Sequence, residues 1–245
     1  LILRKKEILA NLGENGSGKT TRMNMIYGSY YTDEGHIFVN GKEVTIRSQK
    51  DSYELGIGMV HQHFKLIESF TVAENIVLSQ SKGGFLLKPE QIIADIESLG
   101  EKYGLQVDPR AYVWQLGVGE KQRVEILRML YHRSRVLILD EPTIAQDVRG
   151  RRRIAEIVRT LSQRGKLVLA ILHDMDFVAE CFERVIVMAQ GRVVAEGTPR
   201  RVFSDAEALQ AARLDPPHVT QLCTRLGYEG VFLTVEEFLH ACGRD

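Results

Sequence analysis

The sequence predicts an α/β fold with a mostly parallel sheet and an inserted helical segment. A glycine-rich loop at residues 13–21 joins a short apolar strand at residues 8–10 to a helix. Continuous apolar runs at residues 136–139 and 167–172 are typical of parallel strands buried on both faces. Between the loop and these runs, residues 71–134 carry helical signals and no strand pattern. We therefore expect one sheet interrupted by a helical subdomain.

Local signals predict the other elements in chain order. An Asn-Gly turn at residues 40–41 predicts a hairpin, and Thr71 with Glu74 forms a capping box that starts a helix near residue 72. Further strands are expected at residues 57–60, 185–188 and 193–195, and further helices at residues 89–103 and 148–164. We divide the chain into core residues 1–70, a helical subdomain 71–134, core residues 135–197 and a helical extension 198–245.

Composition limits the partners. The 245 residues carry 32 Lys and Arg against 32 Asp and Glu, so no large field of one sign favours nucleic acid or anionic lipid. The three cysteines are scattered without metal-ligand spacing, which suits a reducing compartment. No stretch approaches the roughly 18 consecutive apolar residues of a membrane span, and no secretion leader is visible. A membrane role is expected to come through a partner.

Residues 13–21 fit G-x-x-x-x-G-K-[ST], the phosphate-binding loop of nucleoside triphosphatases. The glycines let successive backbone N–H groups turn toward a phosphate chain, and the helix that follows directs its N-terminus at it. Lys19 is expected to reach the β- and γ-phosphates, and the Thr20 hydroxyl to bind Mg²⁺. The predicted nucleotide contacts in the loop are Gly13, Asn15, Gly16, Ser17, Gly18, Lys19, Thr20 and Thr21.

Asp140 and Glu141 directly follow the apolar run at residues 136–139. An acidic residue that ends a buried strand downstream of a phosphate loop is placed to hold Mg²⁺, which assigns that role to Asp140. The adjacent Glu141 can orient or deprotonate the attacking water. The sequence therefore predicts an ATP and Mg²⁺ site at the carboxyl edge of the sheet.

The segment Leu-Gly-Val-Gly-Glu-Lys-Gln-Arg at residues 116–123 resembles the signature motif of ABC-transporter ATPases, whose common form is L-S-G-G-Q. The order of motifs also agrees with that family and covers nearly the whole chain. The resemblance implies a P-loop NTPase fold with a RecA-like sheet and an inserted helical subdomain. It also implies that the signature of one subunit contacts nucleotide held by another. The residues implied are Gly117, Val118, Gly119 and Glu120.

The resemblance assigns roles to three further residues. Gln62 resembles the Q-loop glutamine that senses Mg²⁺, so the implied Mg²⁺ residues are Thr20, Gln62 and Asp140. Asp147 resembles the D-loop aspartate, which is implied to contact nucleotide, and His173 resembles the switch histidine at the γ-phosphate. The implied catalytic residues are Glu141, His173 and Gln62.

The implied protein is the ATP-hydrolysing subunit of a membrane importer, on the cytoplasmic face of the cell membrane. It pairs head-to-tail with a second ATPase subunit, identical or different, and docks on integral membrane permease subunits; nucleic acid is not an expected partner. One alternative is a soluble, non-transport ABC ATPase, and another is a weak or inactive chimera that still binds nucleotide. The first half resembles sugar and nucleoside importer ATPases, and the second half resembles those of cobalt, nickel and vitamin uptake.

Several positions depart from the family pattern. Gly117 replaces the signature serine, and the chain begins after the strand segment that carries the family's adenine-stacking aromatic residue. Asn11 interrupts a strand and Arg22 occupies an apolar helix position, so burial of either without a partner is expected to cost stability. His61 and His63 lack a third ligand for a metal site, and the basic run at residues 149–153 is expected to be a solvated face.

Overall fold

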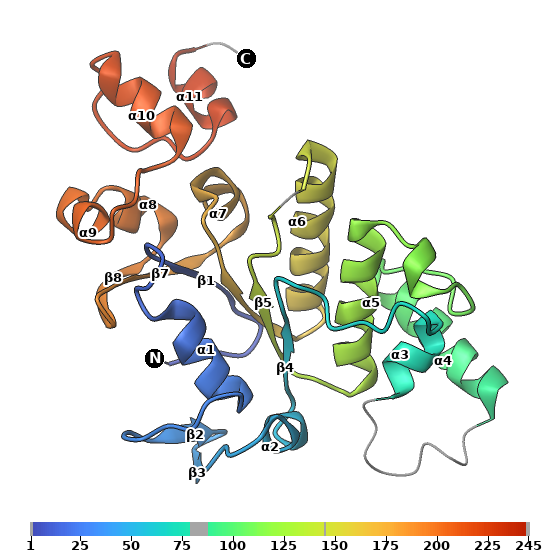
Figure 1. Cartoon of the computed structure of the whole chain (residues 1–245). Helices are drawn as coiled ribbons and strands as arrows, with labels where there is room; N and C mark the ends of the chain where they lie inside the picture. The colour runs from blue at the N-terminus through green and yellow to red at the C-terminus, as the bar shows by residue number, and fades with distance from the viewer. Residues whose placement is uncertain (1, 79–87, 145, 244–245) are drawn as a thin grey trace.

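A six-stranded sheet forms the centre of the protein (Figure 1). The computed structural model describes residues 2–78, 88–144 and 146–243. The strand order is β4-β5-β6-β1-β7-β8, and all neighbouring strands pair in parallel except β7 and β8. The strands are β1 (Ile8–Leu12), β4 (Ile57–Val60), β5 (Val136–Asp140), β6 (Leu167–Ile171), β7 (Arg184–Ala189) and β8 (Arg192–Gly197). The predicted α/β fold with a mostly parallel sheet is confirmed.

Helices cover both faces of the sheet, and a small hairpin lies beside it (Figure 1). The hairpin consists of β2 (Ile37–Val39) and β3 (Lys42–Val44). The helices up to the signature segment are α1 (Lys19–Tyr27), α2 (Gln49–Glu54), α3 (Val72–Val77), α4 (Pro89–Tyr103), the 3-10 helix η2 (Val113–Gln115) and α5 (Val118–Tyr131). The later helices are α6 (Val148–Gln163), α7 (Met175–Cys181), α8 (Pro199–Phe203), α9 (Ala206–Ala211), α10 (His218–Arg225) and α11 (Val235–Ala241).

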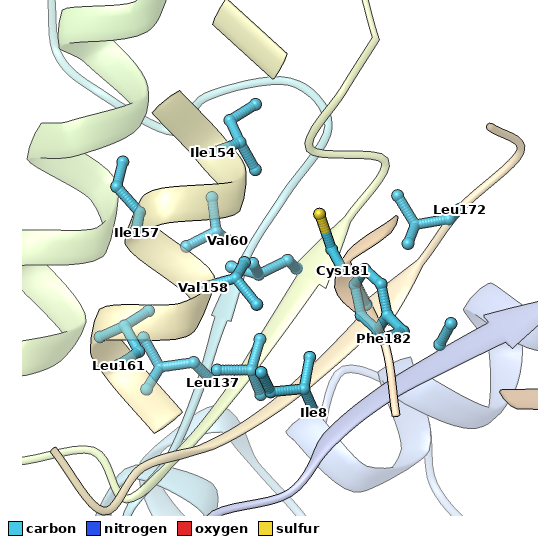
Figure 2. Packing of buried hydrophobic residues seen from close by; sticks show 14 of the residues in the cluster. Ile8, Val60, Leu137, Ile154, Ile157, Val158, Leu161, Leu172, Cys181 and Phe182 are labelled. Carbon is cyan, nitrogen blue, oxygen red and sulfur yellow. The ribbon is translucent and has the colours of Figure 1, made fainter. Parts of the chain in front are cut away.

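Alternating residues of the five parallel strands enter two different buried clusters, because successive side chains of a strand point to opposite faces. In β1, Leu9 packs with Met23 and Tyr27 of α1 on one face. Ile8 and Ala10 enter the larger cluster on the other face, where α5, α6 and α7 pack. Figure 2 shows part of this cluster, with Ile8 and residues of α6 around the sheet. Burial on both faces explains why these strands read as continuous apolar runs.

The helical elements α3, α4 and α5 lie beyond the edge strand β4, and α8 to α11 lie beyond the other edge (Figure 1). The capping box of Thr71 and Glu74 forms as predicted. Among the described residues of 71–134 there is no strand, only an isolated bridge between Thr71 and Tyr112. Residues of α5 nevertheless share one buried cluster with the sheet. The four segment boundaries given above stay predictions.

The structure differs from the sequence predictions in several local features. Helix α2 was not expected; Ser48 caps it by accepting a hydrogen bond from the Asp51 N–H. Strand β7 begins at Arg184, one residue earlier than predicted, and that side chain pairs with Glu7 and Glu196. These differences arise from capping and ion pairs rather than from apolar periodicity. In the described ranges, no helix is long and apolar enough to cross a membrane.

Candidate functional site

Four parallel strands deliver the predicted site residues to the same edge of the sheet. Strand β1 leads into the loop at Gly13, β4 ends before Gln62, β5 ends at Asp140, and β6 ends two residues before His173. The register places Val60 beside Leu139 and Asp140 beside Ile171, so the ends of β4, β5 and β6 are adjacent. The carboxyl edge of a parallel sheet is where such folds bind ligands.

Close contact with the end of β7 requires glycine at the start of the loop. A side-chain Cβ at Gly13 would lie 2.2 Å from the Met188 carbonyl oxygen, and the φ angle of Gly13 is 148°. Gly18 precedes α1 in a left-handed conformation, with φ of 93°, and offers no side-chain cap to the helix. The first turn of α1 also contains no acidic residue. The first N–H groups of α1 therefore remain available to an anion such as a phosphate.

Lys19 lies across the loop with its ammonium group buried. Its Nζ donates hydrogen bonds to the carbonyl oxygens of Gly13, at 2.7 Å, and Glu14, at 2.8 Å. Burial lowers the pKa of Lys19, and the negative charges of Glu141 and Asp140 oppose this change. A buried cation at the start of a helix fits the phosphate groups of a nucleotide.

Asp140 and Glu141 are held in an energetically unfavourable arrangement, with two carboxylates side by side and one strained backbone. Burial, and then the neighbouring Glu141 charge, raise the pKa of Asp140 to about 6, while Lys19 opposes the shift. Glu141 adopts a left-handed backbone conformation with φ of 50°, which is rare for a residue with a side chain. Its N–H donates to the Ile171 carbonyl oxygen at 3.0 Å, which holds this conformation. A divalent cation beside Asp140 would offset the repulsion between the two carboxylates, so the pair fits Mg²⁺.

His173 faces Glu141, with 3.2 Å between its Nε2 and the Glu141 Oε1. Burial and the Lys19 charge lower the pKa of His173, and Glu141 opposes them. The imidazole is therefore neutral at pH 7, and its Nε2–H donates to the carboxylate. The pair can hold a water molecule or a phosphate oxygen between an acceptor and a donor.

An open hollow of about 430 Å³ adjoins this pair. Three predicted residues line it: Asn15, Glu141 and His173. Five further residues were not predicted as site residues: Thr143, Ile144, Gln146, Arg151 and Asp174. Arg151 belongs to the basic run that we expected to be solvated, yet its Nη1 lies 2.8 Å from the Asp174 carboxylate. Only tertiary structure brings these two residues together, so no sequence signal identified them.

The other predicted residues lie outside the hollow. Thr20 and Thr21 are exposed at the start of α1, and the exposed Gln62 follows β4. Asp147 caps α6 by accepting a hydrogen bond from the Gly150 N–H at 2.7 Å. Ala145, in the same D-loop-like stretch, lies outside the described residues. No group of three or more His, Cys, Asp or Glu residues that could hold a metal occurs in the described ranges.

The signature-like segment begins α5, away from the hollow of the same chain. Gly117 precedes the helix, and its N–H donates to Glu120 Oε2 at 3.0 Å. Later in α5, the buried Gln122 donates to the Pro142 carbonyl oxygen at 3.1 Å. This bond ties the signature-like helix to the residue that follows Glu141.

The comparisons with known proteins identify the family. The sequence profile described as "ABC transporter" matches residues 1–144, more than half of the chain. The chain belongs to the ABC transporter family. A nucleotide-free ATP-binding cassette from an ABC transporter has a similar structure, with a TM-score of 0.77 at 24% identity over 86% of this chain and 89% of that one. This likeness confirms the predicted P-loop cassette fold.

Other ABC proteins are also similar. The nucleoside import ATP-binding protein NupA of Lactococcus lactis is 40% identical over 79% of this chain and 38% of its own length. The ribose import ATP-binding protein RbsA 1 of Rubrobacter xylanophilus is 41% identical over 85% of this chain and 41% of its own. This ABC chain thus spans about two fifths of the curated relatives it matches. The structure of cbiO1 from Clostridium perfringens, part of the ABC transporter complex cbiONQ, has a TM-score of 0.73 at 27% identity over 93% of this chain and 88% of that one.

Proposed function

We propose that this chain is the ATP-binding and ATP-hydrolysing cassette of an ABC importer. The observation that carries the proposal is the meeting of Glu141 and His173 beside Asp140 and Lys19 at one edge of the sheet. The relatives are import proteins for nucleosides and for ribose, which supports an importer. Their names also support a sugar or nucleoside as the solute, which the membrane subunits would select.

Each residue has a distinct proposed role. Lys19 and the N–H groups at the start of α1 bind the phosphates, and Thr20, Asp140 and Gln62 hold Mg²⁺. Bound Mg²⁺-ATP supplies the γ-phosphate that is transferred to water. The Glu141 carboxylate orients that water and accepts its proton. Neutral His173 donates its Nε2–H to the Glu141 carboxylate, 3.2 Å away, and with ATP bound this donor would turn to an oxygen of the γ-phosphate.

The position of the signature-like segment supports a head-to-tail dimer. In the described chain, the residues that line the hollow include none of 117–120. A second cassette, identical or different, would bring its own α5 N-terminus to the open side of the hollow, and its Asp147 to the interface. Dimer closure would then drive permease subunits from the cytoplasmic face of the membrane. The hybrid character of the two halves stays a prediction.

Three variants of the purified chain test the proposal. Glu141→Gln keeps the shape of the side chain and removes the base, so hydrolysis should fall about 10²- to 10⁴-fold while Mg²⁺-ATP binding persists. Lys19→Ala should instead weaken nucleotide binding, as measured by equilibrium titration. Val194→Ala, at an exposed position of β8, is the control and should behave as the parent. Hydrolysis at the parent rate in Glu141→Gln would exclude Glu141 as the base. Nucleotide binding without hydrolysis by the parent would support the inactive-chimera hypothesis.

A further inference from the structure

The segment that follows Gln62 is held by side chains of α5. The Lys65 N–H donates to Glu125 Oε1 at 2.9 Å, and Arg128 Nη1 donates to the Lys65 carbonyl oxygen at 3.1 Å. Arg128 also pairs with Glu125 Oε2. Two side chains one helical turn apart therefore satisfy both peptide groups of one loop residue. We call Glu125 and Arg128 the Lys65 clamp.

The Lys65 clamp is buried. The Glu125 side chain is 0% exposed and the Arg128 side chain 11%. Burial raises the pKa of Glu125, and the Arg128 and Lys65 charges and the Lys65 N–H oppose this change. A buried ion pair often contributes no more stability than apolar residues of similar size, because both charges lose their hydration. Packing of α5 alone therefore does not account for the Glu125–Arg128 pair, whereas its two hydrogen bonds to the Lys65 backbone give it a structural role.

The helical elements hold the next residues as well. Asn75 of α3 accepts from the Ile67 N–H at 2.7 Å and donates to the Ile67 carbonyl oxygen at 3.0 Å. The Trp114 N–H donates to the Glu68 carbonyl oxygen at 3.2 Å. Residues 65–68 are thus fixed to α3, α5 and η2, whereas β4 fixes the chain up to Val60. Gln62 lies between these two attachments.

Gln62 depends on these attachments for its position. Its side chain is exposed, and across residues 2–78, 88–144 and 146–243 it has no hydrogen-bond partner. The register of β4 with β5 ends at Val60 beside Leu139, two residues before Gln62, so β4 directs the chain toward the end of β5 that carries Asp140. The backbone on either side must therefore set where the Gln62 amide lies at the Mg²⁺ site proposed above.

We propose that Glu125 and Arg128 are positioning residues, which hold the Lys65 backbone and thereby place the Gln62 side chain beside Asp140. The inference rests on the proposed function, because it gives Gln62 its role. It adds a mechanical link from α5, which begins with the signature-like segment, to the Mg²⁺ site. A shift of α5 would move Lys65 and, through three intervening peptide bonds, Gln62.

The variant Glu125→Gln tests the clamp with little change in volume. Both Glu125 oxygens are used, one by the Lys65 N–H and one by Arg128. An amide offers one oxygen only, so one of these bonds must become an unfavourable contact between two donors. Glu7→Gln is a matched control, because the buried Glu7 also accepts one backbone N–H, from Arg4, and one arginine, Arg184. Glu7 precedes β1 and so lies at the amino-terminal ends of the parallel strands, whereas the proposed site lies at their carboxyl-terminal ends.

Hydrogen exchange of the nucleotide-free chain measures the clamp without any activity. In Glu125→Gln, loss of either bond frees the Lys65 peptide, because an Arg128 side chain turned away from the new amide would also leave the Lys65 carbonyl oxygen. The Lys65 amide should therefore exchange about tenfold faster or more, the change expected for loss of one charge-assisted hydrogen bond. In Glu7→Gln its exchange should be that of the parent. Unchanged Lys65 exchange in Glu125→Gln would overturn the inference, whether or not the chain hydrolyses ATP.

Kinetics then test the route through Gln62. Glu125→Gln should lower kcat about tenfold with little change in KM, and Glu7→Gln should leave both unchanged. In a Gln62→Ala background, Glu125→Gln should cause no further loss, because the residue that it positions is gone. Losses that multiply independently would overturn the positioning role. Absence of hydrolysis in the parent would instead overturn the proposed function, and Lys65 exchange would still decide the clamp.

Discussion

Replacement of Asn11 by leucine should stabilise the protein. Asn11 is 2% exposed in β1, and neither its Oδ1 nor its Nδ2 has a hydrogen-bond partner within the part of the chain that the structure describes. Its neighbours in the adjacent strands are Ile171 and Ile186. Each unsatisfied buried polar group costs about 1–3 kcal/mol. Leucine branches at the same carbon, and its larger volume costs about 1 kcal/mol or more in a packed core. We expect a net gain of about 2 kcal/mol, or about 4–8 °C in Tm for a chain of this size.

Asn75→Leu is a matched control with the opposite expected sign. Asn75 is 3% exposed, similar to Asn11, but its amide bonds Ile67 and the Thr71 carbonyl oxygen. Leucine there would leave the Ile67 N–H without its acceptor, and the loss should cost about 1–3 kcal/mol. The Ile67 and Thr71 carbonyl oxygens would still accept from the Phe70 and Asn75 N–H groups. Calorimetric and urea unfolding of the nucleotide-free variants measure both changes. Equal destabilisation by the two substitutions would refute the reasoning, since it would mean that the Asn11 amide is satisfied in solution.

Three further predictions concern the site and the C-terminal helices. Gly117→Ser fits, because a Cβ would lie 3.7 Å from Glu120 Oε2, and the added hydroxyl should raise the ATPase rate about tenfold in a steady-state assay. Arg151→Met removes the partner of Asp174, next to His173, and should slow hydrolysis more than it weakens nucleotide binding by titration. The hydrogen bond that the His218 imidazole donates to the Asp176 carboxylate raises the pKa of His218, so this contact stabilises the fold at low pH and is lost as pH rises through that raised value. In an NMR titration, Asp176→Asn should bring the His218 pKa down toward its ordinary value.

Much of the fold could be predicted because parallel strands buried on both faces have a strong local signal. Strands β5 and β6 read as uninterrupted apolar runs, and the Asn-Gly turn specified the hairpin of β2 and β3. Helix α2 gave no such signal, since Ser52 is its only buried residue and its start depends on the Ser48 cap. An element that forms because its apolar side chains are buried can be predicted from the periodicity of the sequence. An element that depends on a cap or an ion pair can be located only from the tertiary contacts.

The candidate site divides in the same way. The positions of Lys19, at the start of the helix after the glycine-rich loop, and of Asp140 and Glu141, at the end of a strand, could be predicted because the chemistry proposed for them requires fixed residue types at those places. Arg151 and Asp174 could not, since the ends of α6 and β6 meet only when the chain folds. The Lys65 clamp has no local signal either, because Glu125 and Arg128 lie on a helix face that reads as an ordinary i,i+3 pair.

Three features oppose stability: the raised pKa of Asp140, the positive φ of Glu141, and the Asn11 amide, which has no hydrogen-bond partner among the described residues. Such costs by themselves do not identify function. The first two lie at adjacent residues at the end of β5, where Glu141 and His173 line the hollow and Lys19 acts on both carboxylates, so a cation and a phosphate would relieve them. Asn11 is not among the described residues that line that hollow, and it lies between isoleucines of the flanking strands. The unfavourable features of Asp140 and Glu141 therefore lie where a ligand would bind, whereas the unfavourable burial of Asn11 lies elsewhere and can be removed by a single substitution to leucine.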